Sequence, residues 1–183
     1  MTKTFTLLSL LLVLLLVQGA VAQQQRGDFE AQLTGFYFTT VGSDLSLSMG
    51  TIQGKLGYFF TDHFELGFGP TFTVSTISTP VINYQTGTFT TESKTETDFG
   101  TTVFFVYSFL TKKARTVPYF GAQYYKQSFK NTDDKGSVGV NAGIKYYFTR
   151  RAAFDLAGNY LFSLNKDESG GILLFSFGLS YLF

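Results

Sequence analysis

The stretch Leu173–Phe183, LLFSFGLSYLF, decides the fold because its residues alternate strictly in character. Large apolar side chains take every odd position, and small or polar residues take most of the even ones. Successive side chains of a strand point to opposite faces, so this stretch is one strand with a wholly apolar face. In a water-soluble protein such a face needs a core to cover it, whereas in a transmembrane barrel it meets lipid directly.

Seven further segments show the same alternation and are bounded by polar, glycine-containing or charged residues. In the fifth, both faces carry Tyr or Phe, so its inward face cannot be assigned from the pattern. With the last segment the total is eight, an even number. The seven segments are Phe29 to Thr40, Gly50 to Phe60, Phe64 to Ser75, Thr97 to Phe109, Val117 to Phe129, Ser137 to Phe148 and Ala152 to Leu164.

The connections between these segments alternate in length. Thr61 to His63, Leu110 to Thr116 and Thr149 to Arg151 are short, whereas the other four are longer and more polar, and Thr76 to Glu96 is the longest. Short turns on one side and longer loops on the other are typical of an outer-membrane barrel with both termini in the periplasm. The sequence therefore predicts an all-β fold, an eight-stranded antiparallel up-and-down transmembrane β-barrel. The longest loop is the best candidate for contact with other molecules.

The first residues indicate export. Lys3 precedes the apolar run Leu7 to Val17, and Ala20-Val21-Ala22 supplies a small-x-small cleavage pattern. The run is too short to cross a bilayer, which takes about 20 residues. We expect residues 1–22 to be a cleaved signal peptide and residues 23–183 to be the barrel domain. The chain has no cysteine and a net charge of +1, which argue against a disulfide framework and against nucleic acid as a partner.

The last strand and several strand-to-turn passages carry a resemblance to a known family. The ending Phe177-x-Leu179-x-Tyr181-x-Phe183 resembles that of the small outer-membrane barrel proteins of the OmpA and OmpX type, and the passages in question are Gly57 to Asp62, Val117 to Gly121 and Gly143 to Thr149. The resemblance implies that the last-strand residues Phe177, Leu179, Tyr181 and Phe183 form the signal read by the barrel-assembly machinery. It also implies a Gram-negative outer membrane as the location and its lipid as a partner. It specifies the architecture well and the activity poorly, since such barrels serve as anchors, adhesins or lipid enzymes.

The charged residues expected on the inward face all lie in the half of the barrel nearer the short turns. They are Glu30, Lys55, Glu65, Lys145 and Asp155. Lys145 and Asp155 fall opposite each other on neighbouring strands, close enough to pair. We interpret the five as a lumenal salt-bridge network that satisfies buried charges, with a proton relay or a gated narrow path as the functional alternative. The rest of this face is rich in small residues, so we expect a packed polar lumen without an open pore.

The short turns themselves carry charge and are flanked by rings. Their basic residues, expected to interact with anionic headgroups or with a periplasmic partner, are Lys112, Lys113, Arg115, Arg150 and Arg151. The neighbouring aromatic residues, expected to form the lower girdle of the barrel, are Tyr58, Phe60, Phe64, Tyr107, Phe109, Tyr146, Phe148, Phe154, Tyr181 and Phe183.

Nothing in the sequence suggests catalysis, a cofactor or a metal centre. Lipid A deacylases and palmitoyltransferases built on such barrels need a His and a Ser at the outer leaflet, and the only histidine, His63, falls in a short turn on the expected periplasmic side. The acidic pairs Asp133-Asp134 and Asp167-Glu168 lack the spacing of a calcium loop. We therefore expect a non-enzymatic structural or interaction protein. The alternatives are a narrow channel for small, possibly hydrophobic, solutes that leave sideways through the wall, and a lipid A-modifying enzyme.

Overall fold

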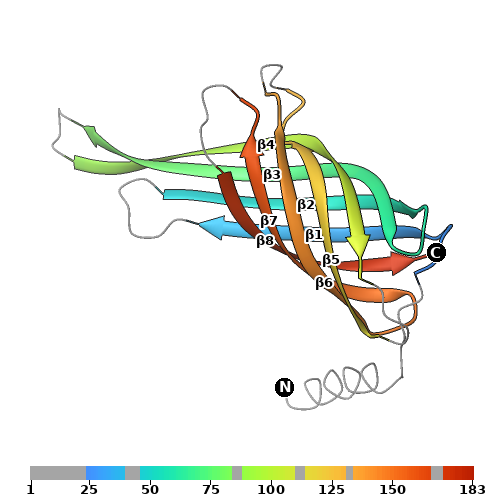
Figure 1. Cartoon of the computed structure of the whole chain (residues 1–183). Helices are drawn as coiled ribbons and strands as arrows, with labels where there is room; N and C mark the ends of the chain where they lie inside the picture. The colour runs from blue at the N-terminus through green and yellow to red at the C-terminus, as the bar shows by residue number, and fades with distance from the viewer. Residues whose placement is uncertain (1–23, 40–45, 84–87, 110–113, 131–133, 166–170) are drawn as a thin grey trace, which may run out of the picture.

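The structure is a computed structural model that describes residues 24–39, 46–83, 88–109, 114–130, 134–165 and 171–183. The expected signal peptide lies outside the described residues. The described residues form eight strands that close into a barrel (Figure 1). The strands are β1 (Phe29–Thr39), β2 (Ser46–Phe59), β3 (Phe64–Asn83), β4 (Thr88–Ser108), β5 (Thr116–Lys126), β6 (Ser137–Tyr147), β7 (Ala152–Ser163) and β8 (Gly171–Leu182).

Every strand pairs antiparallel with its sequence neighbours, and β8 pairs with β1 to close the sheet. The Phe183 amide donates to the Phe29 carbonyl at 2.8 Å, so β8 ends where β1 begins. We call this end, which also carries the β2–β3, β4–β5 and β6–β7 connections, the turn end, and the opposite end the loop end. The predicted fold and chain order are therefore confirmed. Within the described residues, no helix is long and apolar enough to cross a membrane.

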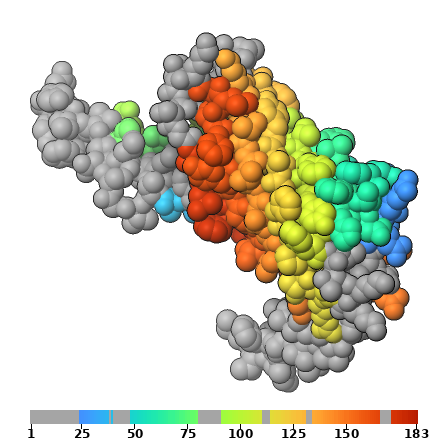
Figure 2. All heavy atoms as spheres, in the orientation of Figure 1, coloured from blue at the N-terminus to red at the C-terminus, as the bar shows by residue number. Residues whose placement is uncertain are grey.

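The outer face of the wall is apolar throughout. Phe175 and Phe177 are each 69% exposed, and the outward residues of the other strands are exposed in the same way. Figure 2 shows part of this wall, from β8 across β7, β6 and β5 to β4. At the turn end neighbouring rings pack against one another at tilted angles: the Phe64 and Tyr107 centroids lie 4.9 Å apart and those of Phe148 and Phe154 lie 4.7 Å apart. This arrangement agrees with the predicted girdle.

The ambiguous fifth segment is resolved by burial. In β5 the buried positions are Val117, Tyr119, Gly121, Gln123 and Tyr125, and the intervening residues face outward. The strand ends at Lys126 and not at Phe129 as expected. Tyr119 and Tyr125 therefore belong to the lumen, where a ring with a polar tip can be satisfied by other inward groups.

Small inward residues create space for large ones, as predicted for a barrel of this size. A Cβ on Gly67 would lie 2.3 Å from the Phe104 ring, and one on Gly57 would lie 1.8 Å from a Glu65 carboxylate oxygen. Phe104 and Glu65 are each at most 4% exposed. The two glycines are thus the reason that a ring and a carboxylate fit inside this barrel.

The expected long loop Thr76 to Glu96 is wrong. β3 runs on to Asn83 and β4 starts at Thr88, so most of that range is a two-stranded ribbon that extends beyond the other strands (Figure 1). Hydroxyl pairs join its strands, with Thr76 and Thr95 3.0 Å apart and Ser78 and Ser93 2.8 Å apart. Because both of its faces are largely polar, hydrophobic alternation does not reveal it. We call the part beyond Ser78 and before Ser93 the arm.

Candidate functional site

A buried ion cluster occupies the bore near the turn end. The Lys145 Nζ atom lies 2.5 Å from Glu30 Oε1 and 3.4 Å from Glu65 Oε2. The three residues are 1–2% exposed and come from β6, β1 and β3, which are not neighbours in the sheet. One ammonium group thus joins carboxylates from different parts of the wall. Such a cluster is stable only if its charges stay paired and hydrogen bonded.

Asp155 lies opposite Lys145 in the β6–β7 ladder, as the sequence predicts. The expected ion pair between them is nevertheless wrong. Asp155 accepts hydrogen bonds from Tyr119 Oη at 2.7 Å and from the Gln32 amide, while the long Lys145 side chain reaches across the bore to Glu30. The alternation of the first strand places Gln32 on the same face as Glu30, but the sequence does not identify Gln32 or Tyr119 as partners of Asp155.

Lys55 is the fifth member of the expected network, and it stands apart. Its Nζ atom lies 5.5 Å from the centroid of the Phe104 ring, a cation–π distance. Among the described residues it forms no salt bridge with a carboxylate. The structure therefore brings Glu30, Glu65 and Lys145 into direct contact and leaves Lys55 and Asp155 to other partners.

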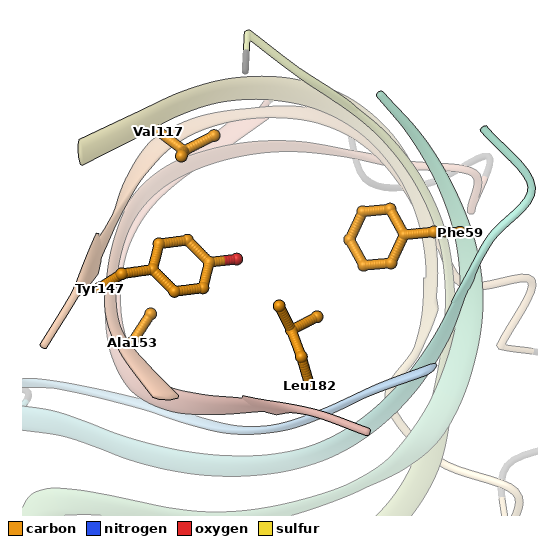
Figure 3. Close-up of a cluster of buried hydrophobic side chains, with 5 residues drawn as sticks. All are labelled: Phe59, Val117, Tyr147, Ala153 and Leu182. Atoms are coloured by element: carbon orange, nitrogen blue, oxygen red, sulfur yellow. The ribbon is translucent and has the colours of Figure 1, made fainter. Parts of the chain in front are cut away.

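Two groups of apolar side chains fill the bore next to the ion cluster, and the Lys145 Nζ atom lies 5.9 Å from the Phe59 ring centroid of one and 5.7 Å from the Tyr119 ring centroid of the other. Figure 3 shows the group at the turn end, which projects from β2, β5, β6, β7 and β8 toward the barrel axis, and whose members are at most 3% exposed. A second group, with exposures of 4–6%, lies beside it. The first group is Phe59, Val117, Tyr147, Ala153 and Leu182, and the second is Phe104, Val106, Tyr119 and Ala157.

Toward the loop end the bore becomes a hydrogen-bonded polar belt. Gln123 Nε2 donates to Asn159 Oδ1 at 3.2 Å, and Asn159 Nδ2 donates to Ser176 Oγ at 3.0 Å. On the other side, the hydroxyls of Thr51 and Thr73 lie 2.9 Å apart. All five residues are buried, so the belt adds a further filled layer.

The loop end holds two adjoining cavities. One, of 540 Å³, is lined mostly by polar and charged side chains, among them Asp98, Lys130 and Asp134. The other, of 400 Å³, is lined mainly by apolar side chains, and the two share Gln127, Ser137 and Ser163. Volumes of this size suit small organic ligands. The barrel is therefore filled at its turn end and hollow at its loop end.

His63 is held in place by contacts with β4. Its Nδ1 atom lies 2.9 Å from the Ser108 carbonyl oxygen, and its ring stacks on Tyr107 with centroids 5.6 Å apart. It lies at the turn end, on the β2–β3 connection. The partner of the imidazole is thus a backbone carbonyl and not a serine hydroxyl.

Acidic residues at the loop end serve local structure. Asp134 accepts a hydrogen bond from the Gly136 amide at 2.8 Å, which supports the positive φ of that glycine. Asp133, Asp167 and Glu168 lie outside the described residues, as do Lys112 and Lys113 of the basic turns. Within the ranges that the structure describes, His, Asp and Glu side chains form no group able to hold a metal ion.

The model of the outer membrane protein beta-barrel domain family matches residues 8–183. The chain belongs to this family. It is an integral outer-membrane barrel protein of bacteria, related to the small OmpA-like barrels. Among curated proteins, none matches the sequence.

Two solved structures resemble this outer-membrane barrel. The N-terminal β-barrel domain of Pseudomonas aeruginosa OprF aligns with a TM-score of 0.53 and 21% identity, over 88% of this chain and 100% of that domain. A designed transmembrane β-barrel aligns with a TM-score of 0.49 and 14% identity, over 88% of this chain and 99% of the design. At these identities the likeness to OprF supports the fold alone.

Proposed function

We propose that this barrel is a structural and interaction protein of the outer membrane, without a through-pore and without enzymatic chemistry, that presents its arm at the cell surface. The observation that carries the proposal is the contrast between its two ends. The bore is filled at the turn end by buried rings and an ion cluster. The loop end projects a polar ribbon whose described residues from Thr91 to Thr97 are all exposed.

The arm has the properties of a recognition element on a rigid support. β4 pairs with β5 only from Thr101 onward, so within the described part of the chain the earlier residues of β4 have β3 as their one neighbouring strand. Exposed sheet edges recruit partner strands unless charges protect them. Glu92, Lys94 and Glu96 alternate along this strand, and Lys94 and Glu96 form an exposed ion pair at 2.6 Å. These charges restrict pairing to partners that complement them.

The proposed orientation places the turn end, where β1 begins and β8 ends, in the periplasm and the arm outside. Since the chain has no cysteine, single cysteines test this without interference. A membrane-impermeant maleimide should label Thr91→Cys on intact cells and label Arg150→Cys only after lysis. The reverse pattern would overturn the orientation. The exposure of Phe177, Leu179, Tyr181 and Phe183, 43–69%, supports the proposal that they form the signal for the barrel-assembly machinery. Polar substitutions at these positions should therefore lower the amount of inserted protein.

The functional test compares the full chain with a variant in which residues 79–92 are replaced by an Asn-Gly turn, which suits a two-residue hairpin connection. Both forms are purified in native membrane particles, and a partner that accompanies only the full chain supports the proposal. If the same proteins co-purify with both forms, the arm is not the recognition element.

The rival functions have their own readouts. In planar bilayers the protein should be electrically silent, and discrete conductance steps would favour the narrow channel. Lipid A from cells with and without the protein should have the same mass, and a change in acylation would favour a lipid-modifying enzyme.

A further inference from the structure

The wall of the barrel opens at one seam. β1 and β8 pair only from Glu30 opposite Leu182 to Gly35 opposite Phe177. Beyond that point β1 remains paired with β2 as far as Thr39, and β8 remains paired with β7 as far as Gly171, but the two strands are no longer joined to each other. The ladder that closes the barrel thus stops partway up the wall.

A cavity of 270 Å³ fills the gap. Its lining comes from Phe36 and Tyr37 of β1 and from the four residues 172–175 of β8. Phe36, Ile172 and Leu174 also line the 400 Å³ apolar cavity inside the barrel. The seam cavity therefore adjoins the apolar cavity on one side and, at Tyr37, Leu173 and Phe175, reaches the outer face of the wall.

Ile172 marks the connection. It has the parity of the inward residues Leu174 and Ser176, both of which are buried, yet 55% of it is exposed. An inward aliphatic side chain on a closed wall would be covered by its neighbours. Ile172 is exposed where it lines both the apolar cavity and the seam cavity.

The height of the seam places it in hydrocarbon. Counting along β8 from Phe183, the last joined residue, Phe177, is about 20 Å away and Leu173 about 33 Å away at about 3.3 Å per residue. With strands tilted by about 40°, these lengths become heights of about 15 and 25 Å. The apolar band of such barrels is about 25 Å tall. The opening thus faces the half of the hydrocarbon that is farther from the turn end.

The three cavities form a series graded in polarity. From the loop-end mouth to the seam in the wall they are the polar cavity of 540 Å³, the apolar cavity of 400 Å³ and the seam cavity of 270 Å³. The carboxylates of Glu96, Asp98 and Asp134 outnumber the one ammonium of the polar lining, Lys130. Lys94 does not line the cavity but forms an ion pair with Glu96. Even when Lys94 is counted with Lys130, the three carboxylates leave the cavity with a net negative charge.

We propose that the loop end of the barrel binds a single-chain cationic amphiphile. Its head lies in the polar cavity, its alkyl chain lies in the apolar cavity, and the β1–β8 seam lets the chain pass between the lumen and the surrounding outer leaflet. The negative excess selects the positive head, and the apolar lining takes the chain. The side of the membrane named here rests on the orientation proposed above.

The test uses a tryptophan as the reporter, because the chain has none of its own. Phe36→Trp places the reporter where the apolar and seam cavities meet, and Phe72→Trp is the matched control on the lipid-facing side of β3. Each full-length variant is placed in phosphatidylcholine nanodiscs and titrated with dodecyltrimethylammonium that carries bromine on its terminal carbon. Quenching of the inner reporter should saturate at one amphiphile per barrel, while quenching of the outer reporter should rise in proportion to the amphiphile in the membrane.

A cysteine pair then closes the seam. Tyr37→Cys with Phe175→Cys lies across the opening, and Leu33→Cys with Leu179→Cys, four residues lower and therefore in the same type of ladder position, lies across the joined part. Closing the upper pair by oxidation, or by a short bismaleimide where the gap exceeds disulfide reach, should abolish the saturable quenching. Closing the lower pair should leave it unchanged. Dodecyl sulfate with bromine on its terminal carbon, which has the same chain length and a negative head group, should bind at least tenfold more weakly than the cationic probe.

Three results would overturn the inference. Quenching of Phe36→Trp that never saturates means that there is no internal site. Saturable quenching that survives closure of the upper pair means that the seam is not the route, and equal binding of both head groups removes the charge selection. If cysteine labelling shows the opposite orientation while saturable quenching persists, only the proposed orientation is refuted and the binding site stands. The two proposals can therefore be refuted independently.

Discussion

Replacing Lys145 by methionine should be among the most damaging single changes inside the barrel. The variant keeps the length of the side chain but leaves Glu30 and Glu65, each at most 2% exposed, without the ammonium that lies 2.5 and 3.4 Å from them. Removing one partner of a buried ion pair costs about 3–5 kcal/mol, because the remaining charge stays buried and uncompensated. The matched control is Lys135→Met, an exposed lysine at the loop end that should change stability by less than about 0.5 kcal/mol.

A double-mutant cycle identifies the partner. Glu30→Gln alone should cost about 1–3 kcal/mol. Combined with Lys145→Met it should cost less than the sum of the two singles, with a coupling of about 1–3 kcal/mol. The coupling of Lys145→Met with Asp155→Asn should be smaller, because Asp155 is bonded to Tyr119 and Gln32. The measurement is urea unfolding in lipid vesicles, followed by far-ultraviolet circular dichroism and by the gel shift of folded barrels. Additive costs for Glu30→Gln and Lys145→Met, or a Lys145→Met cost no larger than that of the control, would refute the reasoning.

Three further changes test the packing of the wall and the bore. Gly69→Ala should lower the unfolding free energy by about 1–3 kcal/mol, because its Cβ would lie 1.8 Å from a backbone carbonyl oxygen of β2, whereas Gly54→Ala, with 3.9 Å to the nearest atom, should be tolerated; equal urea midpoints would contradict this. Tyr119→Phe removes a donor 2.7 Å from Asp155 and should cost about 1–3 kcal/mol in the same assay, and a neutral result would mean that water replaces the hydroxyl. His63→Ala should cost no more than about 1 kcal/mol and leave the lipid A profile of cells unchanged, and an altered profile would revive the enzyme hypothesis.

The sequence was sufficient for the fold wherever the two faces of a strand differ in polarity. The last strand, with Phe175, Phe177 and Leu179 outward and Ser176 and Ser180 inward, shows its environment residue by residue. The prediction was wrong at the polar ribbon of β3 and β4 because Thr and Ser occupy both of its faces, as at Ser75, Thr76 and Ser78. Hydrogen bonding between strands, and not burial, holds that ribbon together, and hydroxyl pairing leaves no periodic signal in hydrophobicity.

The lumenal charges were predicted as a set but not as contacts. Register along neighbouring strands placed Lys145 opposite Asp155, and the structure has that register. The actual partner, Glu30, comes from a strand that is not adjacent. Contact across the bore depends on how the sheet curves, and the register of neighbouring strands does not give that curvature. The split between β1 and β8 could not be foreseen for the same reason. At the split, apolar residues occupy both faces of each strand, Phe36 and Tyr37 in β1 and Leu173 and Leu174 in β8, and this pattern by itself does not show that the two strands separate.

The span of the ion cluster has a consequence for assembly. In a flat sheet β1 and β6 are five strand spacings apart, or about 24 Å, and β3 and β6 are three spacings apart, or about 14 Å. The lysine cannot reach both glutamates while the sheet is flat, so both salt bridges form only when the barrel closes. The ion cluster thus stabilises the closed barrel relative to any open form of the sheet.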